Sequence, residues 1–139
     1  MIVNLQRKIK IQSAAFTPFA VLLRSGIEEV NGRDFSVAFV SDKRMTELNK
    51  FFRGKDSTTD VLSFPHEPDE FDKDDPNLGD IVVSVEQAGR QAKENKLTLE
   101  DEIKQLILHG VLHLCGYDHE TDSGEMNKRE LELRKKLKI

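Results

Sequence analysis

The sequence predicts a mixed α/β (α+β) fold, a single domain over residues 1–139 in which a small, roughly four-stranded sheet packs against helices. A chain of 139 residues is long enough to enclose one hydrophobic core. Its composition, 37% hydrophobic and 33% charged, excludes collagen-like, disulfide-scaffold and strongly disordered proteins. Segments with the two-residue period of strands alternate with segments of helical spacing, which favours a sheet covered by helices.

The first part of the chain predicts a strand, a helix and a second strand. Residues 2–11 alternate apolar and polar side chains, as a half-buried strand does. Residues 16–30 carry apolar side chains at helical spacing, and Asn31-Gly32 is expected to end that helix. Residues 35–40 alternate again between large and smaller side chains, and they predict the next strand.

A helix capped by Ser41 or Asp42 is expected to follow. Its inward face is expected to include Met45, Leu48 and Phe52. Residues 60–64 predict a third strand, and Pro65 indicates that this strand stops there or lies at a sheet edge.

The acidic segment 67–77 has no apolar period and predicts a solvated loop. Residues 80–85 form a short apolar run that predicts the fourth strand, and residues 86–96 predict a helix of mixed polarity.

Two further helices complete the chain. Thr98 is a suitable N-cap for a helix over 99–115, which Gly116 is placed to end. The last helix is expected over 123–137. Its packing residues are expected to be Met126, Leu131, Leu133 and Leu137.

The net charge of −4 comes from one segment. Residues 66–80 hold seven acids and one lysine, whereas residues 1–64 carry a net charge of +3. The overall acidity therefore does not exclude a nucleic-acid partner. No run approaches the roughly 18 apolar residues of a membrane helix. The single cysteine, Cys115, permits no internal disulfide, so we expect a cytoplasmic protein. Because no apolar run is long enough, we expect no membrane partner.

Three of the four histidines fall in one short window. His109 and His113 lie one turn apart on the edge of the apolar face of helix 99–115, so both can face one ion. Gly116 permits a sharp turn after the helix, and His119 can then return as a third ligand. Three imidazoles leave a fourth tetrahedral position open, as in a catalytic zinc site. An all-imidazole site also suits nickel and copper.

The other metal-ligand candidates are weaker. Cys115 projects to roughly the opposite side of the helix from the histidine pair, and we expect it to be a small buried thiol. His66 lies beside the acidic segment, and we expect it to be solvated.

The spacing H-x-x-x-H-x-x-G-x-x-H is that of the metzincin metalloproteases, which favours a zincin-like domain. Those enzymes have a glutamate directly after the first histidine as general base. This chain has Gly110 there, so a peptidase of that mechanism would lack its essential group.

The stretch from His109 to His119 resembles the signature of the YbeY family, single-strand-specific endoribonucleases also called rRNA maturation factors. Three further segments match that family: Phe52-Arg53-Gly54-Lys55, Thr58 to Pro65, and Leu78-Gly79-Asp80-Ile81. Members often have asparagine where this chain has Asp60, a departure that affects local hydrogen bonding.

The resemblance implies one zinc ion held by His109, His113 and His119. It also implies action on ribosomal RNA of the small subunit, in 16S rRNA 3′-end maturation and ribosome quality control. Arg53 and His113 are then the expected catalytic residues, because the Arg53 guanidinium can bind two phosphate oxygens at once. Lys55 is expected to be a solvated charge that attracts RNA.

Three points stay open at the level of the sequence. No general base is evident, since Asp118 suits a supporting or turn-forming role equally well. One alternative is a non-catalytic ribosome assembly factor in which the zinc is structural. Another is a zinc hydrolase of other substrates, and Gly110 makes this the least favoured interpretation. Oligomeric state is not indicated.

Overall fold

The computed structural model describes residues 1–68, 70–71 and 75–139. Its four-stranded sheet has the order β1-β2-β4-β3, and the strands are β1 (Ile2–Asn4), β2 (Asp34–Val40), β4 (Asn77–Ser84) and β3 (Val61–Pro65). β1, β2 and β4 run parallel, and β3 pairs antiparallel with β4 at the sheet edge. The predicted α+β class with a four-stranded sheet is confirmed, and Pro65 lies on an edge strand as expected.

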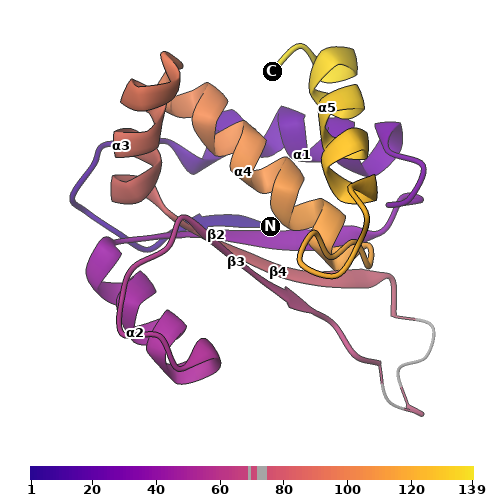
Figure 1. The fold of residues 1–139 in the computed structure, drawn as a ribbon, viewed down its shortest axis with the longest axis horizontal. Helices are drawn as coiled ribbons and strands as arrows, with labels where there is room; N and C mark the ends of the chain where they lie inside the picture. Colours follow the sequence, from indigo (N-terminus) through magenta and orange to yellow (C-terminus); the bar gives the residue numbers. More distant parts are fainter. Residues whose placement is uncertain (69, 72–74) are drawn as a thin grey trace.

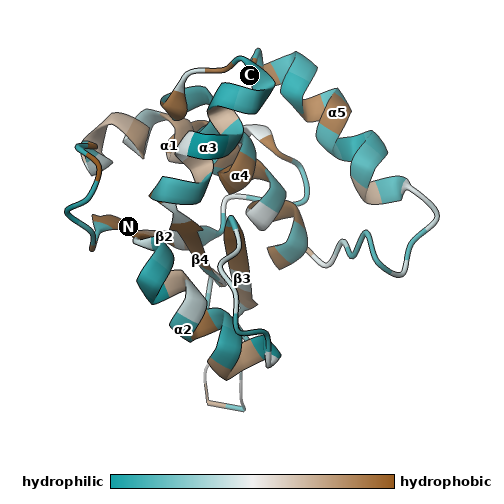
Figure 2. Cartoon of the chain, turned by 60° about the vertical axis from the view of Figure 1, so that its left-hand side comes forward, coloured by the Kyte–Doolittle hydropathy of each residue, from teal (hydrophilic) through white to brown (hydrophobic). Residues whose placement is uncertain are grey.

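Helices cover both faces of this sheet. They are the 3-10 helix η1 (Ser13–Phe16), α1 (Thr17–Gly26), α2 (Asp42–Arg53), α3 (Val85–Asn95), α4 (Leu99–Leu114) and α5 (Glu125–Leu137). Figure 1 shows α1, α3, α4 and α5 on one side of the sheet and α2 on the other. In Figure 2 the strands and α4 are largely apolar, while the outward sides of α2, α3 and α5 are hydrophilic.

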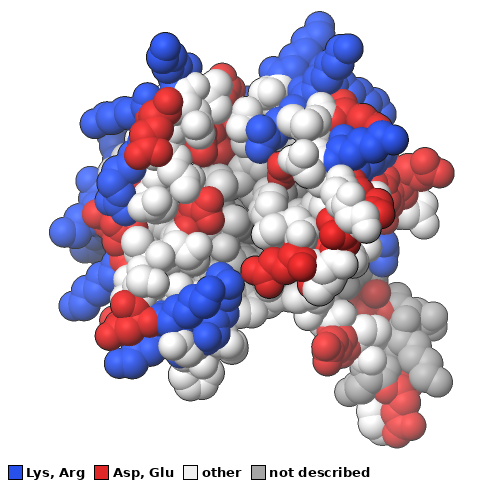
Figure 3. Space-filling model, in the orientation of Figure 1, with Lys and Arg blue, Asp and Glu red and all other residues white. Residues whose placement is uncertain are grey.

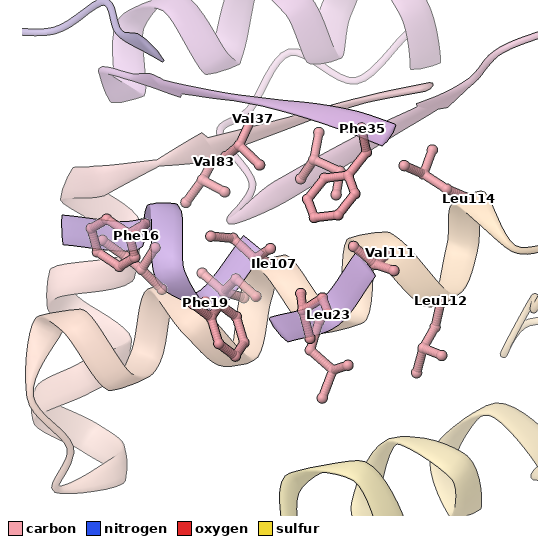
Figure 4. Packing of buried hydrophobic residues seen from close by; sticks show 14 of the residues in the cluster. Phe16, Phe19, Leu23, Phe35, Val37, Val83, Ile107, Val111, Leu112 and Leu114 are labelled. Atoms are coloured by element: carbon pink, nitrogen blue, oxygen red, sulfur yellow. The ribbon is translucent and has the colours of Figure 1, made fainter. Parts of the chain in front are cut away.

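The main core lies between the sheet, α1 and α4. Figure 4 shows side chains from all three meeting there, including Phe16, Leu23, Val83 and Ile107, none of which is more than 2% exposed. The central helix α4 begins as predicted, since the Thr98 side chain accepts a hydrogen bond from the Asp101 backbone N–H at 3.1 Å.

The predicted strand over 2–11 is wrong beyond Asn4. Gln6 is only 7% exposed, and its side chain bonds the backbone locally. Its Nε2 donates to the Ile9 carbonyl at 2.7 Å, and its Oε1 accepts from the Ile9 N–H at 2.9 Å. These side-chain bonds replace the ladder that a longer strand would need.

The predicted helix over 16–30 also differs. α1 ends at Gly26, and Ile27 is extended, with φ −105° and ψ 118°. Ile27 and Val30 are nevertheless buried, at 1% and 0% exposure, because a turn returns them to the core. The apolar spacing therefore predicts the core positions correctly, whereas the prediction of one continuous helix is wrong.

Two residues expected to pack inward are exposed. Phe52 is 55% exposed near the end of α2, and Leu131 is 53% exposed on α5. Met126 and Leu133 of α5 are buried as predicted, and Glu130 rather than Leu131 accompanies them on the inward face.

The acidic segment is described only in part, since residues 69 and 72–74 of the predicted loop 67–77 lie outside the described residues. β4 begins at Asn77, three residues before the predicted start at Asp80. His66 is not fully solvated as expected, because its side chain is 27% exposed and its Nε2 lies 3.4 Å from Asp75 Oδ2. Among the described residues, every helix is too short or too polar to cross a membrane.

Candidate metal centre

A cleft of about 660 Å³ opens between β3 and the C-terminal end of α4. One wall is formed by residues 59–63 and Pro65. The opposite wall is formed by His109, His113 and residues 116–120, and Arg53 contributes from the end of α2. The structure thus brings the predicted histidines and the predicted arginine to one cavity, although they are far apart in sequence.

The three histidine rings converge as the motif predicts. His109 and His113 lie on adjacent turns of α4, and their Nε2 atoms are 3.1 Å apart. Gly116 has a φ of +102°, a backbone conformation that glycine adopts without strain, and the chain turns there so that His119 returns. The His119 ring centroid lies 5.4 Å from that of His109 and 5.1 Å from that of His113. One ligand atom from each ring falls within 4.8 Å of the others.

In His109 and His113, the ring nitrogen that faces away from this cluster has a hydrogen-bond partner. His109 Nδ1 lies 2.7 Å from Glu130 Oε1, and His113 Nδ1 lies 3.0 Å from the Tyr117 carbonyl oxygen. A carbonyl oxygen only accepts, so the His113 Nδ1 carries the proton and the Nε2 lone pair is free to bind a metal. Both rings are oriented for coordination by these bonds.

The donor set fits a divalent transition metal. Burial, and next the neighbouring charge of His109, lower the pKa of His113, so the ring favours the neutral form that binds metals. Three neutral imidazoles suit zinc, and they suit nickel and copper as well. The three histidines can therefore hold one metal ion, whose identity the geometry does not select.

Glu130 is a supporting residue that the sequence reading missed. It is 7% exposed, and its other carboxylate oxygen accepts from Arg134 at 3.3 Å. Burial acts to raise the pKa of Glu130, but the hydrogen bond with His109 and the charges of His109 and Arg134 outweigh it, so this pKa lies below its ordinary value. The signal was its position: Glu130 falls between Met126 and Leu133 at helical spacing on the buried face of α5.

A second set of contacts holds the loop that carries His119. The Tyr117 hydroxyl donates to Glu29 Oε2 at 2.9 Å, and Arg129 donates to both Glu29 oxygens at 2.8 Å. Tyr117 thus orients His113 through its carbonyl while its side chain is fixed to the segment after α1 and to α5. The sequence offered no local signal for this network, because residues 29, 117 and 129 meet only in the fold.

Gly110 has a packing role that explains why no glutamate stands there. A Cβ atom at this position would lie 2.9 Å from Cγ2 of Ile81 and 3.1 Å from its Cγ1 and Cδ1 atoms. The helix approaches β4 so closely that any side chain would displace Ile81.

Ser63 of the matched segment Thr58 to Pro65, Asp118 and Cys115 lie in different surroundings. Ser63 lines the cleft, and its hydroxyl donates to the Gly110 carbonyl at 3.3 Å. Asp118 forms a turn, accepting from the Glu120 N–H at 3.0 Å. Cys115 is half-buried against the core, outside the histidine group, and burial raises the pKa of its thiol.

Asp60, the departure from the family pattern, has a specific set of partners. Its carboxylate accepts from the Val61 N–H at 2.7 Å and from Gln91 Nε2 at 3.2 Å. A carboxylate, which only accepts, satisfies both donors and joins the start of β3 to α3.

Several known proteins are similar to this chain along most of its length. A family model described as Endoribonuclease YbeY matches residues 1–138. Endoribonuclease YbeY of Nautilia profundicola is 47% identical over 107 residues, which are 77% of this chain and 74% of that protein. Endoribonuclease YbeY of Aquifex aeolicus is 44% identical over 127 residues, 91% of this chain and 83% of that protein. The solution structure of TM1509 from Thermotoga maritima superposes with a TM-score of 0.63 at 31% identity, covering 95% of this chain and 85% of that chain. The chain, with its three histidines at one cleft, belongs to the endoribonuclease YbeY family.

Proposed function

We propose that this protein is a zinc-dependent, single-strand-specific endoribonuclease that acts on RNA of the small ribosomal subunit in the cytoplasm. Its role is in 16S rRNA 3′-end maturation and ribosome quality control. Membership of an endoribonuclease family supports the RNA-cleaving activity. The observation that carries the proposal is the shared cleft, in which Arg53, whose guanidinium suits a phosphate, accompanies a three-histidine cluster.

His109, His113 and His119 hold the ion in this proposal. A zinc ion bound by three neutral ligands supplies a double positive charge that stabilises the more negative transition state of phosphodiester cleavage. Glu130 and the Tyr117 carbonyl keep the His109 and His113 rings turned toward the ion. Because His119 is exposed, the cluster is accessible from solvent, as a site for a polymeric substrate must be.

Arg53 binds the substrate in this proposal. Its planar guanidinium can donate two parallel hydrogen bonds to the non-bridging oxygens of one phosphate. At the mouth of the histidine cleft, these bonds orient the phosphodiester toward the cluster and neutralise part of its charge. A lysine would keep the positive charge but lose the paired geometry.

The direct test is cleavage of a single-stranded rRNA fragment by rigorously purified protein. We expect His113→Ala to abolish cleavage, and Arg53→Ala to lower kcat/KM by about 100-fold, the order found when one transition-state hydrogen-bond donor is removed. Arg53→Lys should recover only part of that loss, while Lys138→Ala, on the exposed C-terminal end, should match the parent.

Cleavage by His113→Ala at the parent rate would mean that a contaminating nuclease is responsible, and the proposal would fail. Binding to the small subunit without any turnover by the purified protein would also overturn it, in favour of an assembly factor with a structural zinc.

A further inference from the structure

Two consecutive phenylalanines at the end of α2 are exposed to solvent. Phe51 is 82% exposed and Phe52 is 55% exposed, although aromatic side chains of this size are usually buried. α2 ends at Arg53 and is followed by its C-cap Gly54, whose φ is +70°, so both rings occupy the last helical turn. The main packing of α2 on the sheet uses Met45, which is fully buried, and so does not require an exposed ring at Phe51.

The two rings belong to an ordered aromatic row. The Phe51 and Phe52 ring centroids are 4.8 Å apart, and the Phe52 and Phe64 centroids are 4.9 Å apart, both edge to face. Phe64 lies on β3 between Ser63 and Pro65, which line the histidine cleft. The row therefore begins at the strand that forms one wall of the cleft and ends at the exposed ring of Phe51.

Positive charge accompanies this row. Lys50, Arg53 and Lys55 are exposed in the same short segment, and Arg53 also lines the cleft. The one acid among residues 50–56 is Asp56, whose Oδ2 lies 4.0 Å from Lys50 Nζ. Both side chains of that pair are largely exposed, so the contact neutralises little of the lysine's attraction for an anion.

The opposite rim of the cleft has the other sign of charge. Asp118 and Glu120 line it, and both are exposed. Figure 3 shows Lys and Arg side chains gathered over α2 and acidic side chains over the neighbouring segment that follows α4. A polyanion leaving the cleft is repelled on that side and attracted over the end of α2.

We propose that the end of α2 is a binding surface for single-stranded RNA outside the cleft, with bases stacked on Phe51 and Phe52 and phosphates held by Lys50 and Lys55. This inference rests on the proposed function, since it describes how the substrate of the same cleft continues beyond it. Exposed aromatic rings interleaved with cations are the general means of binding single strands, because every base offers a π-face.

The same chemistry selects single strands over other partners. Bases in a duplex are stacked on each other and present no face to Phe51, so a duplex meets only the cations. A protein partner fits less well, because the cores of protein interfaces are depleted of lysine, whereas Lys50 and Lys55 flank the rings here.

The test is the affinity for a fluorescently labelled, fully 2′-O-methylated single-stranded RNA, measured by anisotropy and checked for intactness on a gel. We expect Phe51→Ala to weaken binding by about 5- to 100-fold, the range for loss of one stacked base. Phe51→Trp should restore it. Leu131→Ala, which removes an apolar side chain of 53% exposure from α5, should bind like the parent. A duplex of the same sequence should bind Phe51→Ala and the parent equally.

Ultraviolet crosslinking of the same RNA to the unaltered protein, mapped by mass spectrometry, gives an independent reading and should place crosslinks on Phe51 or Phe52. Equal affinity of Phe51→Ala and the parent, or crosslinks confined to other segments, would overturn the inference. The inference would also be overturned if the end of α2 bound a protein and Phe51→Ala left the RNA affinity unchanged. If Phe51→Ala weakens binding of the methylated RNA but the unaltered protein does not cleave the rRNA fragment, only the proposed function is contradicted. Failure of the inference can therefore be distinguished from failure of the proposed function.

Discussion

The capacity of the three histidines to hold a metal depends on two ring nitrogens that face away from their cluster. Glu130 bonds His109 Nδ1, and the Tyr117 carbonyl bonds His113 Nδ1, so each ring presents Nε2 to the cluster. A carboxylate partner also makes the imidazole a better electron donor. We therefore expect the metal affinity of the site to depend partly on Glu130 of α5, which lies outside the three-histidine group.

Replacement of Glu130, the partner of His109 Nδ1, should weaken metal binding. Glu130→Gln keeps the shape of the side chain but removes its charge, and we expect metal affinity to fall by about 10- to 100-fold. A competition titration against a chelating dye measures the change. Glu132→Gln, an exposed substitution two positions along α5, is the control and should bind metal like the parent; equal affinity in both variants would refute the supporting role of Glu130.

Single-residue predictions succeeded where the information is local. The spacing of His109, His113 and His119 around Gly116 places three rings together because helix periodicity and one turn determine it. Glu130 was not predicted as a partner of His109, nor Tyr117 as a partner of Glu29, since these contacts depend on how α5 and the turn at residues 28–32 pack in space. Arg53 was identified through the family resemblance, and no local pattern would have placed it beside the histidines.

Among the elements, the contact of α4 with β4 fixes the position of the site. At Gly110 the helix backbone comes so close to Ile81 that a Cβ atom would lie 2.9 Å from its side chain. The adjacent residue is His109, so this close approach also sets the distance between the histidine pair and the sheet. A glycine here has a steric reason that is independent of catalysis.

An added methyl group should therefore destabilise the fold. We expect Gly110→Ala to lower the free energy of unfolding by about 1–3 kcal/mol, as overpacking of a core does. Urea unfolding measures this, and Ile81→Ala in the same chain should reduce the penalty by providing room for the methyl group. If Gly110→Ala were as stable as the parent and showed no coupling to Ile81, the close approach would not exist in solution.

The start of a helix was predicted best where a suitable N-cap residue precedes a run of apolar residues at helical spacing. The predicted N-caps Thr98 of α4 and Ser41 of α2 are confirmed, because each side chain accepts a backbone N–H three residues on, a bond encoded within a few positions. The first strand failed because Gln6 bonds backbone groups that a strand would have paired. The inward face of α5 was misassigned to Leu131 because a buried glutamate, Glu130, occupied the position that apolar periodicity expects.

At the scale of the whole molecule, one carboxylate joins three parts of the chain. Glu29 accepts from Arg129 on α5 and from Tyr117 in the loop after α4. The Arg129 hydrogen bond is the main reason that the pKa of Glu29 falls from its ordinary value of 4.5 to about 2. This network, and the strand order itself, could not be read from the sequence, because both are set by packing between distant segments.

The lowered pKa makes stability depend on pH. A carboxyl group that loses its proton more easily when folded stabilises the protein above its unfolded pKa of 4.5, and this contribution disappears as the pH falls toward 2. The side chains of Glu29 and Arg129 are both partly exposed. We therefore expect Glu29→Gln to lower the free energy of unfolding by about 1–2 kcal/mol at pH 6 and by much less at pH 3. Urea unfolding at the two pH values measures the difference, with the exposed Glu28→Gln as the control. A penalty for Glu29→Gln that is the same at both pH values would contradict this account.

The central feature of the molecule is the three-histidine cluster, in which we propose that three imidazoles bind a single divalent ion and leave one coordination position open at the cleft. X-ray absorption spectroscopy of the metal in the purified protein, combined with its metal content, tests this most directly. The account predicts one ion per chain, surrounded by light nitrogen and oxygen atoms with an imidazole outer shell, and no ion when the three histidines are replaced by alanine. A sulfur neighbour near 2.3 Å, which would mean coordination by Cys115, or full metal content in the triple variant, would contradict it.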